Sequence, residues 1–225
     1  MRIHKEIAMN HKGQDFFVGD IHGEYDLLLA TLAQCQFNFE CDRLFSVGDI
    51  VDRGPDSMKC VELLQKPWFY AVRGNHEEML LADEASDLAR IHRNAGGEWF
   101  YQCSVQEQDR LKVLVDAYCP FAFTIESKFG NIGVCHANAP RHWSALQTAT
   151  LDDIELLQDC AWSKKQYQQV KRGEVFHIDE VKFVIHGHVN CARVTTNVNQ
   201  LWIDTLMRTR RLTVLSAQQA YMVIA

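Results

Sequence analysis

Three short apolar runs, each followed at once by polar residues, dominate the pattern of hydrophobic and polar positions along this chain. They cover residues 15–18, 43–47 and 68–72. Each run has the length of a buried strand and contains the β-branched and aromatic residues that strands favour. Glycine then interrupts each run and allows a sharp turn of the backbone, and a helical pattern follows. The sequence therefore predicts three strand–loop–helix units with polar loops at the carboxyl ends of the strands.

Helical periodicity continues after these units. Apolar residues three and four apart predict helices near 26–32 and 56–64, with Asp56 as the N-cap of the second. Residues 77–117 predict a helical insertion that a loop at 94–99 interrupts. The candidate core positions of this insertion are Leu80, Leu81, Leu88, Ile91, Leu111 and Val115.

Extended patterns dominate the second half of the chain, with a short helix expected at 152–158. Strands are predicted at 121–126, 132–135, 183–185, 201–203, 212–215 and 221–224. The sequence contains no internal repeat or long linker, so we expect one domain spanning 1–225. The pattern alone gives a mixed α/β fold.

Composition narrows the class of protein. The 225 residues are 47% hydrophobic and 23% charged, which is typical of a soluble globular domain. The net charge of −6 argues against nucleic acid as the main ligand. No apolar run approaches the length of a membrane span, and the start of the chain lacks the apolar stretch of a signal peptide. We therefore expect a cytoplasmic protein that contacts neither membrane nor nucleic acid.

Eight cysteines could indicate disulfides or a zinc site. They stand at positions 35, 41, 60, 103, 119, 135, 160 and 191, without a single Cys-x-x-Cys pair. Reduced and mostly buried thiols are the better interpretation.

The polar loops contain residue types that bind metal ions or transfer protons. The first loop is Gly19-Asp20-Ile21-His22-Gly23, the second runs from Gly48 to Gly54 as Gly-Asp-Ile-Val-Asp-Arg-Gly, and the third is Gly74-Asn75-His76-Glu77. Asp20 and Asp49 are 29 positions apart, and Asp49 and Asn75 are 26 apart. Two later predicted strands also end at histidines, at His136 and at His186-Gly187-His188.

This ordered set resembles the metal-dependent serine/threonine phosphoprotein phosphatases, in particular their small bacterial and phage branch (lambda-phosphatase-like). The patterns Gly-Asp-x-His-Gly, Gly-Asp-x-x-Asp-Arg-Gly and Gly-Asn-His-Glu are met in full. The likeness is strongest over 47–79 and extends more weakly to residue 225. It implies a four-layer αββα calcineurin-like metallophosphatase sandwich around two central mixed β-sheets.

The resemblance also implies a dinuclear metal centre. Its ligands would be Asp20 and His22 at one ion, Asn75, His136 and His188 at the other, and Asp49 as the bridge. Such a set of oxygen and nitrogen donors suits manganese, and it also accommodates iron or zinc. His186 lies two residues before His188, but the family's ligand follows the glycine, so His186 is interpreted as a packing or supporting residue.

For catalysis, the resemblance implies direct in-line attack on phosphorus by a hydroxide shared between the two metals. His76 would protonate the leaving alkoxide, and Asp52 would hold the other ring nitrogen of His76. Arg53 would grip the phosphate as a planar fork. A second phosphate clamp is less defined: the branch has arginine where this chain has Lys164, so Lys164 is the first choice and Arg172 the second.

The sequence thus favours a protein phosphatase that acts on phosphoserine and phosphothreonine in a phosphoprotein partner, with phosphotyrosine left open. A monomer is expected. One alternative is a symmetrical dinucleoside tetraphosphate hydrolase, although that sister family usually has alanine at the position of Asp52. A metallonuclease is disfavoured because Asn190 stands where related nucleases have histidine. The third alternative is a non-catalytic binding module on the same scaffold.

Three further features affect this prediction. The branch usually has glycine after Asp204-Thr205, where this chain has Leu206, so the local backbone there is open. Trp99 is expected in the core, with the substrate groove as the alternative. His92 is expected to be a surface or structural residue.

Overall fold

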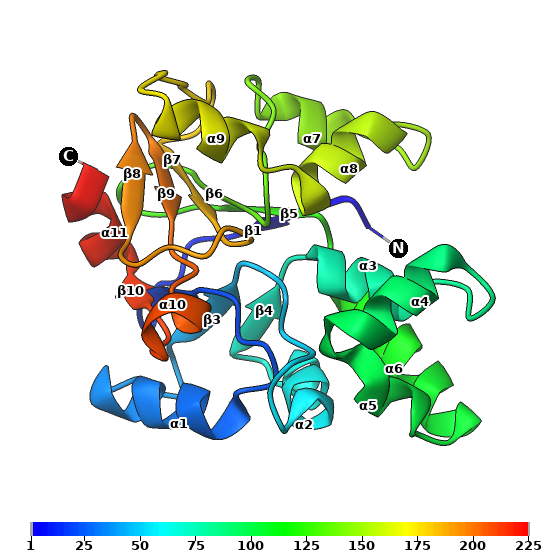
Figure 1. Cartoon of the computed structure of the whole chain (residues 1–225). Coiled ribbons are helices and arrows are strands. Elements are labelled where there is room, and N and C mark those ends of the chain that lie inside the picture. Colours follow the sequence, from blue (N-terminus) through cyan, green and yellow to red (C-terminus); the bar gives the residue numbers. More distant parts are fainter. Residues whose placement is uncertain (1, 225) are drawn as a thin grey trace.

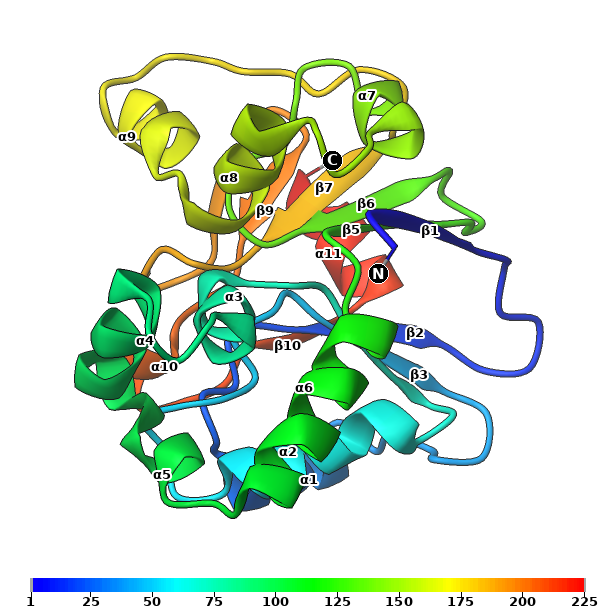
Figure 2. The same cartoon turned by 90° about the vertical axis from the view of Figure 1, so that its right-hand side faces the viewer.

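Two β-sheets stack face to face at the centre of the molecule (Figure 1). The computed structural model describes residues 2–224. One sheet has four strands in the order β10-β2-β3-β4, and the other has six in the order β1-β5-β6-β7-β9-β8. Helices cover the outer faces of both sheets (Figures 1 and 2). The predicted α/β sandwich with two central mixed sheets is confirmed.

The four-stranded sheet carries the three runs that open the sequence pattern. Its strands are β2 (Asp15–Val18), β3 (Arg43–Ser46), β4 (Phe69–Ala71) and β10 (Val214–Ser216). β2, β3 and β4 are parallel, and β10 pairs with β2 in the antiparallel direction. Because the carboxyl ends of parallel strands meet at one edge of a sheet, the three polar loops lie together.

The six-stranded sheet brings two more loops to the same region. Its strands are β1 (His4–Ile7), β5 (Ala122–Ile125), β6 (Ile132–Cys135), β7 (Phe183–His186), β8 (Thr195–Asn197) and β9 (Gln200–Trp202). β6 and β7 are parallel neighbours. The histidines that follow them therefore leave the sheet on the same side.

Helices form the two outer layers and the flanks. One outer layer contains α1 (Tyr25–Gln34), α2 (Ser57–Glu62) and the short η1 (Leu63–Gln65), and the other contains α7 (Ser144–Thr148), α8 (Ile154–Trp162) and α9 (Lys165–Lys171). The insertion lies along one flank as α3 (Asn75–Leu81), α4 (Asp87–His92), the π-turn η2 (Arg93–Gly97), α5 (Glu98–Tyr101) and α6 (Val105–Tyr118) (Figure 1). The chain closes with α10 (Leu206–Thr209) and α11 (Ala217–Ile224).

Three apolar cores separate the four layers. The core between the sheets is built on aromatic residues such as Phe17, Phe45 and Phe123. The other two lie between each sheet and its helices. Burying these side chains is the main stabilising contribution, at about 25 cal/mol for each Å² of apolar surface. The sandwich therefore provides a rigid base for the loops at the strand ends.

Most predicted strands are confirmed within a residue or two, but the prediction of a strand at 221–224 is wrong. These residues belong to helix α11. Ser216 and Gln219 form a reciprocal cap at its start: the Ser216 hydroxyl accepts from the Gln219 N–H, and the Gln219 side chain accepts from the Ser216 N–H. This Ser-x-x-Gln pattern is a helix-start signal that overrides the short apolar run.

Two smaller predictions also need correction. Ile91 is exposed rather than in the core, because Ala89 and His92 occupy the inward face of α4. Asp56 stands at the N-cap of α2 but makes no capping hydrogen bond with its side chain, which pairs instead with Lys59 at 2.8 Å.

The expectation of unpaired and mostly buried thiols is confirmed, since all eight cysteines are free and five are buried. Within residues 2–224, no helix combines the length and the apolar character needed to cross a membrane.

Candidate active site

The loops after five strands bring the candidate ligands together around Asp49. The Asp49 carboxylate has one oxygen toward each of two groups of side chains: Oδ2 lies 3.9 Å from His22 Nε2, and Oδ1 lies 3.4 Å from His136 Nε2. Two sets of donor atoms each fall within 4.8 Å of one another. They are His22, Asp49 and His76, and Asp49, His136 and His188.

Asp20 and Asn75 complete these two groups. Asp20 Oδ2 lies 4.0 Å from His22 Nε2, and the Asp20 carboxylate also accepts the backbone N–H of His188 at 3.2 Å. Asn75 Oδ1 lies 3.2 Å from His136 Nε2. All six residues that the sequence nominates as ligands therefore gather in one place, although they span 168 positions of the chain.

Backbone carbonyl groups fix the orientation of the three nominated histidines. Val51 O accepts from His22 Nδ1 at 3.0 Å, Val47 O accepts from His136 Nδ1 at 2.6 Å, and Trp162 O accepts from His188 Nε2 at 2.9 Å. Each bond requires a ring proton on the outer nitrogen, so the other ring nitrogen is directed to the site and is the one that could bind a metal ion. This is the usual arrangement of histidines that bind a metal ion.

The charges of the site also fit cations. Burial, followed by the neighbouring Asp204 carboxylate, raises the pKa of Asp20 well above its usual range. Burial and the Asp49 charge raise the pKa of Asp204 to about 6. Asp204 Oδ1 is buried without a hydrogen-bond partner among residues 2–224. A cluster of buried carboxylates is costly unless cations compensate it, so these residues fit divalent ions.

Burial and the neighbouring charges also shift the pKa values of the histidines. Burial lowers the pKa of His22 to about 4 and that of His188 to about 3. Burial also opposes the charged form of His136, but the Asp49 carboxylate outweighs it and raises the pKa of His136 to about 10. A proton on His136 thus provides the positive charge that a bound cation would otherwise supply.

His76 and Asp52 form a buried pair beside this cluster. Asp52 Oδ2 accepts a hydrogen bond from His76 Nδ1 at 2.6 Å. Burial opposes the imidazolium form, yet the Asp49 and Asp52 carboxylates raise the pKa of His76. His76 Nε2 is directed to the site, where Arg53 Nη2 lies 2.9 Å from it and Arg53 Nη1 lies 2.6 Å from His22 Nε2. The arrangement can hold an anion and supply a proton next to it.

Backbone strain concentrates at these same residues. The φ angle is positive at His22, Asp49, Asp52, Arg53 and His188, with values between 46° and 73°. Non-glycine residues rarely adopt this region, and each such residue costs of order 1–3 kcal/mol. Strain at five residues of one site indicates that the fold stabilises them for a functional geometry.

The two nominated phosphate clamps lie at opposite ends of one helix. Lys164 precedes α9 and is exposed. Burial and the charge of His136 are the main causes that lower the pKa of His188, the Asp49 carboxylate opposes them, and the charge of Lys164 adds to the lowering. Arg172 follows the last residue of α9, and its guanidinium pairs with Glu174 at 3.2 Å.

Sequence reasoning missed several residues that support the site. The Glu77 carboxylate accepts the backbone N–H groups of Gly74, Asp49 and Ile50 at 2.8–2.9 Å, and so joins two of the loops. Its place inside the third motif was the available signal. No sequence signal indicated that Asp204 would have a buried carboxylate oxygen without a hydrogen-bond partner. Leu206, the departure from the family pattern, is buried at the start of α10.

Trp99 was predicted in the core, and it packs against that core while its indole N–H donates to Asp52 Oδ1 at 2.7 Å. His92 is fully buried and also contacts Asp52. His186 stacks on Trp202 with ring centroids 5.1 Å apart, in a packing position.

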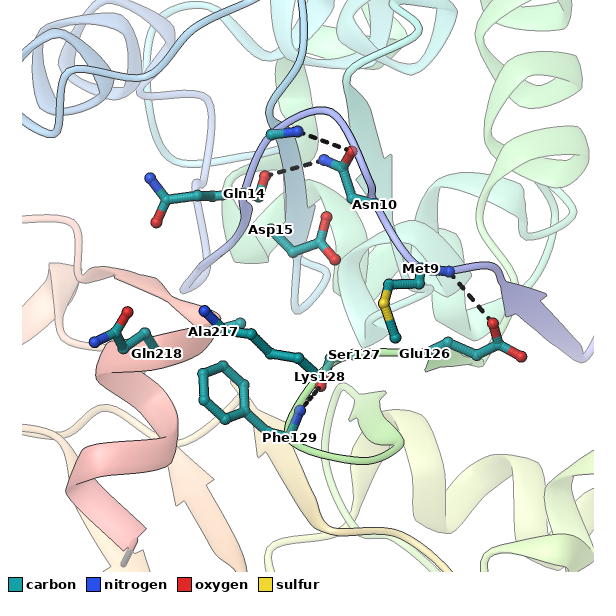
Figure 3. A pocket seen from close by; sticks show the side chains of 11 residues that line it. Met9, Asn10, Gln14, Asp15, Glu126, Ser127, Lys128, Phe129, Ala217 and Gln218 are labelled. Atoms are coloured by element: carbon teal, nitrogen blue, oxygen red, sulfur yellow. Dashed lines mark hydrogen bonds between the residues drawn. The ribbon is translucent and has the colours of Figure 1, made fainter.

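A separate cavity of about 250 Å³ lies away from these residues (Figure 3). It is formed by the segment before β2, the turn between β5 and β6, and the start of α11. Two of its polar side chains have partners: Asn10 Oδ1 accepts the N–H of Gly13, and Asp15 pairs with Arg43. None of the nominated site residues lines it.

The stacked sheets and the histidines and carboxylates gathered around Asp49 define a metallophosphoesterase. A family model described as calcineurin-like phosphoesterase matches residues 16–192, and the chain belongs to this family. The protein is thus a phosphoesterase, and its family implies divalent metal ions.

Curated relatives carry two kinds of name. Serine/threonine-protein phosphatase 2 of Escherichia coli (strain K12) is 34% identical over 204 residues, which cover 90% of this chain and 91% of the relative. Serine/threonine-protein phosphatase 1 of Salmonella typhimurium is 32% identical over 205 residues, with 90% and 91% covered. A symmetrical bis(5'-nucleosyl)-tetraphosphatase of Buchnera aphidicola is 28% identical over 188 residues, covering 83% of this chain and 61% of the relative.

Solved structures agree on the fold. A protein serine/threonine phosphatase from Saccharomyces cerevisiae superposes with a TM-score of 0.61 at 16% identity, covering 96% of this chain and 82% of that one. A cold-active protein-tyrosine phosphatase from a psychrophilic Shewanella gives 0.58 at 17% identity, with 96% and 77% covered.

Proposed function

We propose that this protein is a phosphoprotein phosphatase that hydrolyses phosphoserine and phosphothreonine monoesters. The observation that carries this proposal is the buried pair of His76 and Asp52, joined at 2.6 Å. A serine or threonine alkoxide is a poor leaving group and needs a proton as it departs, a service worth about 10²–10⁴-fold in rate. The two relatives named serine/threonine-protein phosphatases, which match over nine-tenths of their length, also support it.

We further propose where the metal ions bind. Asp20, His22 and Asp49 would hold one ion, and Asp49, Asn75, His136 and His188 would hold the other. Manganese is our first choice, and iron or zinc would suit the same donors. When bound, such ions acidify a water molecule and offset the charge of the phosphoryl oxygens.

The chain's own residues then have distinct roles in this proposal. Arg53 binds the phosphoryl oxygens through its two terminal nitrogens. In the structure these nitrogens donate to His22 Nε2 and His76 Nε2, and they would turn from the two rings to the phosphate when metal and substrate bind. His76 Nε2 donates the proton to the leaving oxygen, while the Nδ1 bond to Asp52 keeps the ring in place. Lys164 is the proposed second clamp on the phosphate, because its positive charge is close enough to His188 to lower the pKa of that histidine.

The symmetrical dinucleoside tetraphosphate hydrolase is the second candidate, because relatives with that name match much of the chain. The pair of His76 and Asp52 argues against it on chemical grounds. Splitting a tetraphosphate releases a nucleotide phosphate, whose last pKa is near 6. Such a group leaves without the proton that an alkoxide requires.

A direct comparison tests the proposal. We expect the manganese-loaded protein to hydrolyse a phosphoserine peptide with a kcat/KM at least about 100-fold above that for diadenosine tetraphosphate. A preference for the nucleotide would replace the proposed function with the second candidate. Inactivity on both, with the metal sites filled, would favour a binding module.

A further inference from the structure

We propose that His92 and Trp99 are positioning residues, which hold the Asp52 carboxylate so that Asp52 in turn orients His76. The inference rests on the proposed role of His76 as proton donor. It assigns a function to the helical insertion at 77–117, which packs beside the two sheets.

Asp52 accepts from three rings at once. Oδ1 accepts from Trp99 Nε1 at 2.7 Å and lies 3.1 Å from His92 Nε2, and Oδ2 accepts from His76 Nδ1 at 2.6 Å. His92 Nε2 also lies 3.0 Å from Oδ2, so this ring nitrogen bridges the two oxygens. A carboxylate has about four lone-pair sites. The insertion therefore satisfies the half of Asp52 that His76 leaves free.

Full burial gives these contacts their importance. Neither Asp52 nor His92 exposes any of its side chain to solvent. Water thus cannot replace a lost donor without rearrangement of the core. Without His92 and Trp99 the carboxylate could rotate about its last bond, and the direction of its bond to His76 would no longer be fixed.

The π-turn is shaped to bring these rings to Asp52. Gly97 packs against the face of the His92 ring so closely that a Cβ at this position would overlap it. Gly96 has a φ of 106°, and its carbonyl lies 3.4 Å from the N–H of Arg53. A Cβ on Gly96 would stand 2.7 Å from that nitrogen. The two glycines thus let the turn close over Asp52 and Arg53.

Tyr101 secures the far side of the His92 ring. Its hydroxyl lies 3.1 Å from His92 Nδ1 and donates to the carbonyl of Ala89 at 3.1 Å. Tyr101 in α5 thus contacts His92, and His92 contacts Asp52 in the loop after β3. Residues 40 to 47 positions away from Asp52 therefore control its orientation.

A positioning role predicts losses that depend on the leaving group. Phenyl phosphate releases a phenol with a pKa of about 10, like tyrosine, whereas 4-nitrophenyl phosphate releases a more acidic phenol that needs less help from His76. For Trp99→Phe and His92→Leu we expect kcat on phenyl phosphate to fall about 10-fold or more, as for other residues that support a functional side chain. On 4-nitrophenyl phosphate we expect less than about a threefold change, with KM little altered on both.

Two variants control for packing. His92→Gln retains an N–H donor at the reach of Nε2, so it should recover much of the activity on phenyl phosphate. Trp68 packs against the same apolar core as Trp99 but contacts the rings of Phe37 and Phe39. Trp68→Phe therefore removes a similar set of atoms and should leave the ratio of the two rates unchanged.

A signal independent of turnover completes the test. The short bond between His76 and Asp52 should give a low-field proton resonance that disappears in His76→Asn and shifts or broadens in Trp99→Phe. Equal losses on both phosphates, or an unaltered resonance, would overturn the inference and leave His92 and Trp99 as core residues. Because both substrates are simple monoesters, this result is separate from the peptide comparison that tests the proposed function.

Discussion

Glu77 fixes the backbone of Asp49: its carboxylate accepts the backbone N–H of Asp49 at 2.8 Å. The same carboxylate accepts the N–H groups of Ile50 and Gly74 at 2.9 and 2.8 Å. Three backbone donors from two loops thus converge on one side chain that is fully buried. Glu77 belongs to the third sequence motif, and all three of these hydrogen bonds are to backbone groups.

Replacing Glu77 should therefore destabilise the fold. Glu77→Ala leaves three buried N–H groups unsatisfied, at about 1–3 kcal/mol each, so we expect a loss of at least about 3 kcal/mol in the free energy of unfolding. Glu77→Gln keeps one acceptor oxygen and should lose less. Urea denaturation measures both. The exposed Glu84, paired with Arg93 at 3.3 Å, is the control, and Glu84→Ala should cost less than about 1 kcal/mol. Similar losses at the two positions would contradict the role of Glu77.

His76→Asn tests the proton donor. We expect kcat on a phosphoserine peptide to fall at least about 100-fold, because the leaving alkoxide then lacks its proton. Both metal ions should remain, as elemental analysis would reveal. His76 also lies among donor atoms that could hold an ion with His22 and Asp49. Loss of one metal in the variant would make His76 a ligand instead of the acid.

Lys164 and Arg172 are separated by paired substitutions. Lys164→Ala should raise KM for phosphopeptides roughly fivefold, a size expected of an exposed charge, with kcat changed less. Arg172→Ala should leave KM unaltered, since its guanidinium pairs with Glu174. Lys164→Arg should equal or exceed the activity of the original chain, because a planar fork holds phosphate by two bonds. The reverse ranking of the two alanine variants would exchange the assignments.

Metal removal should abolish activity, and rebinding of the metal ions should release protons from the ligands. In the metal-free site, burial opposes the charge of His136, but Asp49 raises its pKa to about 10. His136 is therefore protonated at neutral pH, and a cation that takes its lone pair must displace that proton. Affinity for manganese should thus rise with pH up to about 10, by up to tenfold per unit. Calorimetry in buffers of different ionisation enthalpy should detect release of at least about one proton at pH 7.5. Binding without proton release would remove His136 from the ligand set.

The sequence by itself determined the strands that end in functional loops. A short apolar run followed by Gly-Asp or Gly-Asn has few alternatives to a buried strand and a tight turn, and parallel pairing then carries Asp20, Asp49 and Asn75 to one edge. Local chemistry also marked the start of α11 through Ser216 and Gln219, a signal that the apolar run at 221–224 obscured.

Only the tertiary structure decided how the insertion meets the site. Hydrophobic periodicity predicts Ile91 in a core and leaves His92 open as a surface or structural residue, whereas in the fold Ile91 is exposed and His92 is buried against the Asp52 carboxylate. The tertiary structure also decided that Asp204 Oδ1 is buried without a hydrogen-bond partner among residues 2–224. It likewise decided which backbone carbonyl groups orient His22, His136 and His188. Contacts between residues distant in sequence depend on the packing of whole layers, and no local pattern of residues encodes that packing.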